Sequence, residues 1–206
     1  MPLLALVRHG ESIWNAQNRF TGWIDVPLSP KGEEEARKAG RMVKARGVTF
    51  DVAYTSALTR AQRTLDLMLE EMGTRLPIIR DQALNERMYG DLQGLNKDAM
   101  RERYGEHIVH LWRRSFDIPP PNGESLKDTA ARTLPFFERA ILGDIRDGLN
   151  VLVVAHGNSN RSIMMQLESL TPQQVLDLNL ETGVPYVYQL DREGRVLCKD
   201  VLPLGE

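Results

Sequence analysis

Short apolar runs alternate along the chain with longer amphipathic or capped stretches. The apolar runs predict strands at residues 3–7, 51–55, 76–80, 150–155, 185–190 and 196–201. The stretches between them predict helices at residues 30–45, 57–72, 96–114, 125–146 and 161–170. Because the strands alternate with helices, the pattern indicates an α/β fold with a mostly parallel central sheet. In such sheets, ligands bind at the carboxyl ends of the strands.

Local signals mark two of the predicted helices. Ser29 and Pro30 are typical of a helix N-cap and first position, and three glutamates at 33–35 suit the positive end of the helix dipole. Gly47 follows where that helix is expected to stop. In the stretch 125–146, Pro135 predicts a bend, a break or a second helix start.

The chain has 206 residues, 42% of them hydrophobic and 26% charged, which predicts one globular domain over residues 1–206. The single cysteine, Cys198, favours a reducing compartment. The apolar start lacks a basic region, and no stretch approaches the roughly 20 apolar residues of a membrane helix. We therefore expect a cytoplasmic protein without a membrane partner. A net charge of -2 gives no overall electrostatic case for nucleic acid, although local arginines can still bind a small anion.

Two segments resemble each other at the ends of predicted strands. Val7-Arg8-His9-Gly10 and Val154-Ala155-His156-Gly157 each place a His-Gly pair directly after an apolar strand. If the strands are parallel neighbours, both histidines emerge at one rim of the sheet, where glycines admit close backbone approach and helix N-termini favour anions. The alternative is that they are two unrelated histidines at strand ends.

His9 has a second feature, since Arg8 precedes it at the end of the strand. A neutral imidazole nitrogen can attack phosphorus, and guanidinium groups neutralise the charge that develops on the phosphoryl oxygens. Neighbouring side chains on a strand point apart, but this rule relaxes at its last residue. The pair therefore indicates a phosphoryl-transfer site.

Further motifs extend these observations into a family resemblance. Leu6-Val7-Arg8-His9-Gly10-Glu11-Ser12 resembles the signature of the histidine phosphatase superfamily. Other segments, in order along nearly the whole chain, are similar to the cofactor-dependent phosphoglycerate mutases. They include Asn18-Arg19-Phe20-Thr21-Gly22-Trp23, Leu84-Asn85-Glu86-Arg87-Met88-Tyr89-Gly90, Trp112-Arg113-Arg114, Gly123-Glu124-Ser125 and His156-Gly157-Asn158-Ser159. The resemblance implies a three-layer α/β/α fold of the phosphoglycerate mutase type.

The resemblance also implies catalytic roles. His9 would become phosphohistidine, Arg8 and Arg60 would clamp the transferring group, and His156 would donate a hydrogen bond to it. Glu86 would carry the proton of the substrate hydroxyl, for which a raised pKa is expected. Without the surrounding motif, Glu86 would be interpreted as an ordinary solvated glutamate.

A second set of residues would bind the rest of the substrate. The resemblance implies substrate contacts from Ser12, Asn15, Thr21, Gly22, Tyr89, Lys97, Arg113, Arg114, Gly157 and Asn158. A ligand with two phosphates and a carboxylate carries roughly -4 to -5, so one cationic clamp is insufficient and a second is expected. The alternative for Arg113 and Arg114 is a solvated basic helix end.

The activity implied is the interconversion of 3-phosphoglycerate and 2-phosphoglycerate in glycolysis and gluconeogenesis, with 2,3-bisphosphoglycerate as the cofactor that primes His9 and with no metal. The expected partners are small-molecule phosphoglycerates, and the chain is either a monomer or a homodimer. Two alternatives stay open: a phosphatase of the same superfamily that hydrolyses the phosphohistidine, and a phospho-ligand sensor without turnover.

Overall fold

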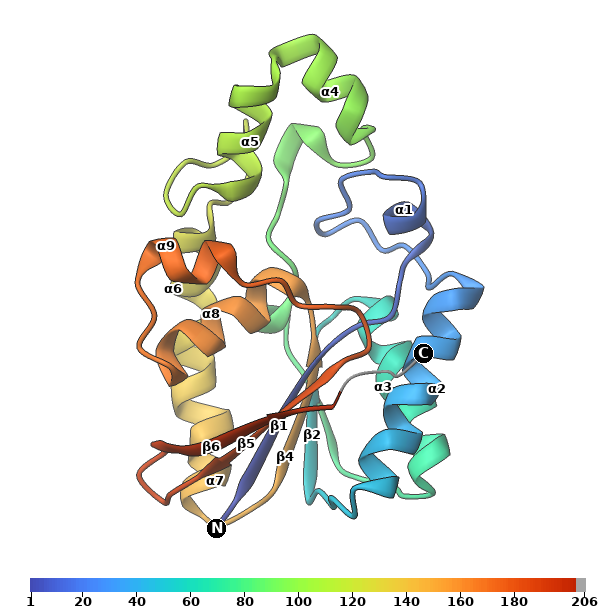
Figure 1. Ribbon diagram of the computed structural model, residues 1–206, viewed down its shortest axis with the longest axis vertical. Helices are drawn as coiled ribbons and strands as arrows, with labels where there is room; N and C mark the ends of the chain where they lie inside the picture. The colour runs from blue at the N-terminus through green and yellow to red at the C-terminus, as the bar shows by residue number, and fades with distance from the viewer. Residues whose placement is uncertain (203–206) are drawn as a thin grey trace.

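The computed structural model describes residues 1–202, whose strands form one six-stranded sheet in the order β3-β2-β4-β1-β5-β6 (Figure 1). The strands are β1 (Leu3–Arg8), β2 (Val52–Thr55), β3 (Ile78–Arg80), β4 (Val151–Ala155), β5 (Pro185–Leu190) and β6 (Val196–Val201). The four strands from β3 to β1 are parallel, whereas β5 and β6 are antiparallel to their neighbours. The prediction of an α/β fold with a mostly parallel sheet is confirmed.

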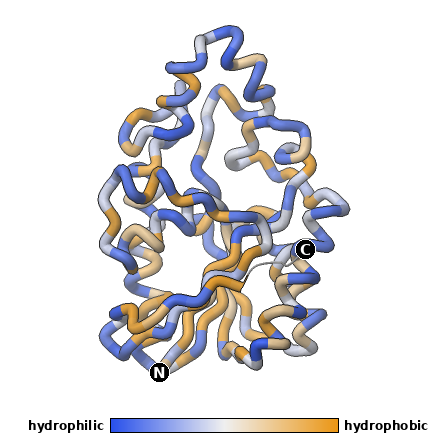
Figure 2. The backbone as a smooth tube through the Cα atoms, viewed as in Figure 1, coloured by the Kyte–Doolittle hydropathy of each residue, from blue (hydrophilic) through white to orange (hydrophobic). Residues whose placement is uncertain are grey.

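The central strands are apolar on both faces because helices cover both faces. In β1, Leu4 and Leu6 pack into one hydrophobic cluster, and Ala5 and Val7 pack into a second one on the opposite face. β4 alternates in the same way, and its five residues are all buried. Figure 2 shows these strands as the most hydrophobic part of the backbone. The result is the three-layer α/β/α arrangement, with a core on each side of the sheet.

The two outer layers come from different parts of the chain. One consists of α2 (Pro30–Ala45) and α3 (Thr59–Met72), and the other of α6 (Leu126–Phe136), η3 (Phe137–Ile141), α7 (Leu142–Arg146) and α8 (Gly157–Leu167) (Figure 1). As expected, the Ser29 hydroxyl accepts from the Gly32 N–H and caps α2, with Pro30 in its first turn. Of the helices in residues 1–202, none has the length and apolar character needed to cross a bilayer.

The single helix predicted for residues 96–114 is wrong. The structure has two helices there, α4 (Lys97–Tyr104) and α5 (Glu106–Arg114), with Gly105 between them at a φ of 85°. This left-handed backbone angle ends α4 and turns the chain, and glycine adopts it without steric cost. Consequently Lys97 and Arg113 belong to separate helices that face one another above the sheet (Figure 1).

One other helix boundary also differs from prediction. α8 begins at Gly157, four residues before the expected start, because His156 is already its N-cap. The helical stretch predicted for residues 125–146 is present over 126–146. Pro135 lies inside α6, and one residue beyond it, after Phe136, the helix widens into the π-helical turn η3.

Several short elements were not predicted. They are α1 (Ile13–Ala16), η1 (Gln82–Leu84), η2 (Gly90–Leu92) and α9 (Pro172–Asp177). η2, α4 and α5 lie beyond the carboxyl ends of the strands and enclose a small separate cluster of Phe20, Leu92, Met100 and Val109. This cap over the rim of the sheet supplies one wall of the cavity described below.

Gly10 allows the start of α2 to approach the loop that follows His9. A methyl group built on Gly10 would lie 2.1 Å from the carbonyl oxygen of Gly32, which is main chain and cannot move aside. Gly10 is therefore required by the packing of the protein's own main chain, and not by the approach of a ligand that the sequence suggested. That expected reason suits Gly157 better, because the nearest atoms to a methyl group built there would be 3.7 Å away.

We predict that Gly10→Ala destabilises the protein by at least about 1–3 kcal/mol, because it overpacks this contact. Urea unfolding of the variant measures the change. Gly143→Ala is the matched control, since nothing lies within 4 Å of its added methyl group and it lies in α7. An unchanged free energy of unfolding in Gly10→Ala would contradict the close contact.

Candidate active site

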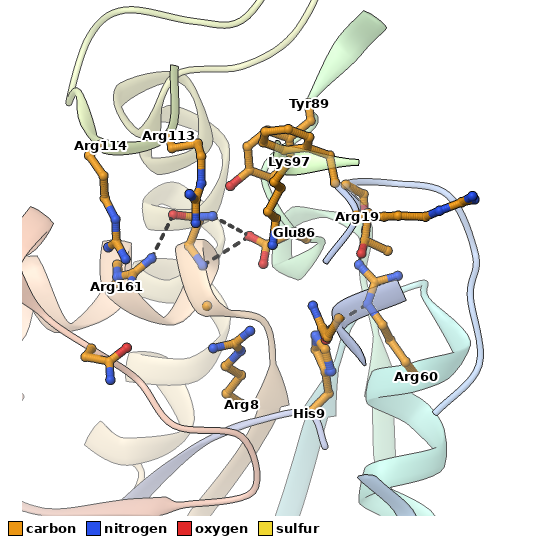
Figure 3. A pocket seen from close by; sticks show the side chains of 17 residues that line it. Arg8, His9, Arg19, Arg60, Glu86, Tyr89, Lys97, Arg113, Arg114 and Arg161 are labelled. Atoms are coloured by element: carbon orange, nitrogen blue, oxygen red, sulfur yellow. Dashed lines mark hydrogen bonds between the residues drawn. The ribbon is translucent and has the colours of Figure 1, made fainter. Parts of the chain in front are cut away.

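A cavity of about 160 Å³ lies at the carboxyl rim of the sheet, beneath the α4–α5 cap (Figure 3). Its lining comes from segments distant in sequence: Arg8, His9, Asn15, Arg19, Phe20, Thr21, Gly22, Arg60, Glu86, Tyr89, Lys97, Arg113, Arg114, Gly157, Asn158, Arg161 and Asn179. Seven of these side chains are arginine or lysine, and Glu86 is the sole carboxylate among them. The cavity is therefore built for an anion with several negative groups.

His9 is held with one ring nitrogen directed at the cavity. Its main-chain N–H donates to the Ala155 carbonyl at 2.9 Å, which joins the ends of β1 and β4. Its Nδ1 lies 2.6 Å from the Gly10 carbonyl, which can only accept, so Nδ1 carries the proton of the neutral ring. Nε2 then keeps its lone pair, and Arg60 Nε lies 3.4 Å from it. This nitrogen is suited to nucleophilic attack.

His156 packs against His9 as the matching strand ends predicted. The two ring centroids are 4.9 Å apart in an edge-on arrangement, and the Ser56 hydroxyl lies 2.7 Å from His156 Nε2. Both rings are buried. Burial, followed by mutual repulsion and the charges of Arg60 and Arg8, lowers the pKa of His9 well below its ordinary value. Burial and the same two arginines also lower the pKa of His156, so both rings are neutral near pH 7.

These lowered pKa values predict a pH-dependent stability. Below the ordinary histidine value of 6.5, the unfolded chain binds protons that the folded protein excludes, so acid favours unfolding. The free energy of unfolding should fall as the pH drops from about 6.5, by up to roughly 1.4 kcal/mol per pH unit for each ring. Urea titrations at about pH 7.5 and about pH 5.5 measure this slope. The variant with both His9→Gln and His156→Gln should lose most of this pH dependence. A slope equal to that of the unmodified protein would contradict the lowered pKa values of the two histidines.

Arg8 and Arg60 flank His9 on opposite sides (Figure 3). Arg60 is almost fully buried and donates from Nη1 and Nη2 to the carbonyls of Ile24 and Gly22, at 3.0 and 2.7 Å. Burial lowers the pKa of Arg60 to about 10, which leaves it charged at neutral pH. Arg8 Nη1 donates to the Leu180 carbonyl at 2.8 Å, and its buried Nε has no partner within residues 1–202. An oxygen of a bound phosphate would satisfy that nitrogen.

Glu86 faces the cavity with one of its two carboxylate oxygens engaged. Oε1 accepts hydrogen bonds from the N–H groups of Arg87 and Asn158 and from the Asn158 side-chain amide, at 2.8, 3.1 and 2.9 Å. The expectation of a raised pKa is wrong for the ligand-free protein. Burial alone would raise it, but these donors together with Arg8 and Arg60 outweigh burial and lower the pKa of Glu86. Glu86 is therefore ionised at neutral pH, in the form that can accept a proton.

The far end of the cavity is a second cationic cluster, formed by Lys97, Arg113 and Arg114 (Figure 3). Burial and the nearby Arg113 charge lower the pKa of Lys97, as expected where cations lie close together. Arg87 braces this end, since its Nη2 donates to the Tyr89 hydroxyl at 2.9 Å and to the Arg113 carbonyl at 3.0 Å. Tyr89 and α5 are thereby fixed relative to each other.

Arg132 of α6 fixes the loop that carries Glu86. It donates to the carbonyl of Glu86 at 2.8 Å and is paired with Glu124, whose Oε2 accepts the Met88 N–H. The same guanidinium also bonds main-chain carbonyls at Gln82, Ala83 and Asn85. Trp23 Nε1 donates to the Glu86 carbonyl at 2.6 Å. These contacts explain the Gly123-Glu124-Ser125 motif as a support for the glutamate, a role not assigned from sequence.

Of the fifteen predicted site residues, thirteen line the cavity, and Ser12 and His156 do not. Ser12 is fully buried, and its hydroxyl accepts from the Asn15 N–H as the N-cap of α1, so it positions Asn15 instead. His156 lies behind the wall, against His9. Sequence reasoning missed Arg19, Phe20, Arg161 and Asn179. Arg161 had one available signal, because it is three residues after Asn158 on a helix and such residues share a face.

Comparison with known proteins agrees with this geometry. The sequence profile of the histidine phosphatase superfamily (branch 1) matches residues 4–199. The chain belongs to the histidine phosphatase superfamily. Within residues 1–202, no group of three or more His, Cys, Asp or Glu side chains is placed to hold a metal ion.

Similar curated proteins cover almost the whole chain. It is 59% identical to a 2,3-bisphosphoglycerate-dependent phosphoglycerate mutase of Parvibaculum lavamentivorans, over 97% of this chain and 96% of that protein. A protein of the same name from Beijerinckia indica is 57% identical over 98% and 99% of the two chains. Among solved structures, a phosphoglycerate mutase from Bacillus anthracis is 27% identical with a TM-score of 0.80, covering 98% of this chain and 93% of that one. A putative alpha-ribazole-5'-P phosphatase from Escherichia coli is 25% identical with a TM-score of 0.82, covering 98% and 95%.

Proposed function

We propose that the protein is a 2,3-bisphosphoglycerate-dependent phosphoglycerate mutase, an isomerase that interconverts 3-phosphoglycerate and 2-phosphoglycerate through a phosphohistidine at His9. The observation that carries the proposal is the pair of cationic clusters at the two ends of one cavity, with Glu86 between them. The relatives at 57–59% identity bear that name. We assign the protein to the cytoplasm, and the proposed reaction uses no metal ion.

His9 is the group that receives and returns the phosphoryl group. Its Nε2 lone pair attacks phosphorus, while Nδ1–H stays bonded to the Gly10 carbonyl and stabilises the positive charge that develops on the ring. Arg8 and Arg60, on either side of the ring, meet the charge on the phosphoryl oxygens. Because their guanidinium groups are already anchored to main-chain carbonyls, little reorganisation accompanies transfer.

Glu86 handles the proton of the substrate hydroxyl. When that oxygen attacks the phosphoryl group on His9, its proton passes to the carboxylate, and in the reverse step the proton returns. A bound phosphate adds negative charge beside Glu86 and therefore raises its pKa from the lowered value of the ligand-free protein. This rise makes the Glu86 carboxylate a stronger base, as removal of the proton from the substrate hydroxyl requires.

The residues present fit 2,3-bisphosphoglycerate, a ligand of roughly -4 to -5 charge. Arg8 and Arg60 suit one phosphate, and Lys97, Arg113 and Arg114 suit the other end. Thr21 Oγ1 is buried in the lining without a partner in the part of the chain that the structure describes. When bound, this cofactor supplies the phosphoryl group that primes His9.

The decisive experiment measures conversion of 3-phosphoglycerate to 2-phosphoglycerate with and without added 2,3-bisphosphoglycerate, in the presence of a chelator. Phosphate release is followed in the same samples. Interconversion that depends on bisphosphoglycerate and exceeds phosphate release supports the proposal. Phosphate release without interconversion would identify a phosphatase, and no labelling of His9 by bisphosphoglycerate would identify a binding protein without turnover.

A further inference from the structure

Arg161 lines the cavity, and each of its three nitrogens donates a hydrogen bond to the protein. Its Nε and Nη2 both donate to the Leu178 carbonyl, at 3.0 and 2.8 Å, and Nη1 donates to Asn158 Oδ1 at 3.2 Å. Burial lowers its pKa to about 10, so it is a cation at neutral pH. These contacts hold the guanidinium in one position, and the contact from Nη1 places it to orient the Asn158 amide.

The contact to Asn158 determines which end of its amide faces Glu86. With Oδ1 held by Arg161, the Nδ2 group is directed to Glu86 Oε1 at 2.9 Å (Figure 3). A flipped amide would place Oδ1 against the carboxylate and Nδ2 against the guanidinium, so both contacts would become repulsive. Arg161 and Glu86 together therefore leave one orientation of the amide.

The same arrangement distinguishes the two oxygens of Glu86. All three hydrogen bonds that the Glu86 carboxylate accepts from residues 1–202 end on Oε1. Oε2 accepts none from those residues and lies on the side of Gly157, on the cavity lining. An oxygen with free lone pairs is the one that can take a proton from a hydroxyl group.

We propose that Arg161 is a positioning residue for the transfer reaction: by fixing the Asn158 amide it anchors Glu86 through Oε1 and leaves Oε2 as the oxygen that exchanges the proton. The inference rests on the proposed function. In the step itself, the substrate O–H bond breaks, its proton goes to Oε2, the oxygen bonds to phosphorus, and the bond from phosphorus to His9 Nε2 breaks. The electron pair of that bond returns to the imidazole.

The first test is the variant Arg161→Gln, with kcat and KM measured in the mutase assay. We expect kcat to fall roughly 10- to 100-fold, since misplacing a reacting group by about 1 Å can cost that much. KM should stay within about threefold, because a residue that acts by positioning Asn158 contributes to the rate of transfer and not to substrate binding. A raised KM with unchanged kcat would show instead that Arg161 binds substrate, and would overturn the proposal.

The second test is a double-mutant cycle with Asn158→Ala. If Arg161 acts through Asn158, the double variant should be no slower than the slower single variant. If the two losses multiply, Arg161 acts by another route, such as its hold on the Leu178 carbonyl, and the proposal fails. Arg161→Lys serves as the second variant if Arg161→Gln does not fold, because lysine keeps the charge but lacks the fork that spans both acceptors.

A third measurement is independent of turnover. The side-chain amide resonances of Asn158 should shift and broaden in Arg161→Gln, because the amide is released. The acid limb of the kcat profile should move to higher pH, since Glu86 loses a stabilising donor while Arg8 of β1, Arg60 of α3 and Tyr89 of its own loop still face it. An unchanged amide signal and pH profile would overturn the proposal. Absence of mutase activity in the unmodified protein would refute the proposed function separately.

Discussion

Replacing His9 by alanine is expected to abolish the acid-labile phosphoenzyme and to lower mutase turnover by at least about 10⁴-fold. The reason is geometric. His9 Nε2 is the ring nitrogen that faces the cavity with Arg60 beside it, whereas His156 lies behind the wall with its Nε2 at the Ser56 hydroxyl. No other imidazole lines the cavity within residues 1–202. Labelling with radioactive 2,3-bisphosphoglycerate, followed by treatment with acid, measures the phosphoenzyme directly.

The chain offers a matched control for this experiment. His107 is an exposed residue of α5, so His107→Ala should label as well as the unmodified protein. Unfolding curves of both variants show whether His9→Ala is folded, so that loss of the phosphoenzyme can be attributed to the missing imidazole. Retention of the label in His9→Ala, at any residue, would refute His9 as the nucleophile.

Glu86→Gln is expected to lower kcat by about 10²- to 10⁴-fold, the usual contribution of general acid–base catalysis, while binding changes little. The amide oxygen of glutamine can still accept the bonds made to Oε1, so the side chain should keep its place. What it loses is the second oxygen that takes up the proton. Pre-steady-state transfer from labelled enzyme to 3-phosphoglycerate measures the rate, and titration with bisphosphoglycerate measures affinity.

The pH dependence of kcat/KM tests the direction of the Glu86 pKa shift. The pKa of Glu86 is lowered in the free protein, so kcat/KM should stay constant as the pH falls from neutral and decline only below about 4.5, where the carboxylate becomes protonated. Glu86→Gln should lack that decline. A loss of affinity as large as the loss of rate would argue that Glu86 binds substrate and transfers no proton.

Most of the fold could be predicted because its signals are local. Runs such as residues 150–155 are too apolar to be anything but buried, and Ser29 and Pro30 define the start of α2. Gly105 was overlooked because amphipathic residues continue on both sides of it, and a single positive φ is enough to divide a helix. The sequence predicts the start of α8 four residues too late because residues 158–160 are polar, although His156 caps a helix that begins at Gly157.

The candidate site was predicted as a set of residues, but not as a set of contacts. Arg132 and Arg161 support Glu86 and Asn158 from helices, and nothing in their sequence neighbourhood shows which carbonyl or amide they reach. The direction of the Glu86 pKa shift could not be predicted from the sequence either. Burial raises this pKa and hydrogen bonding lowers it, and only the distances in the structure decide which effect is larger.

The position of β1 in the sheet has a consequence for how the protein is made. β1 lies between β4 and β5, and Leu4 pairs with Val151, so the strand that leads to His9 has no neighbour until about three-quarters of the chain has left the ribosome. Until then its apolar residues and unpaired main chain stay exposed. Growing chains that stop before β4 will therefore contain the nucleophile without its site, and they are the forms most dependent on chaperones during synthesis.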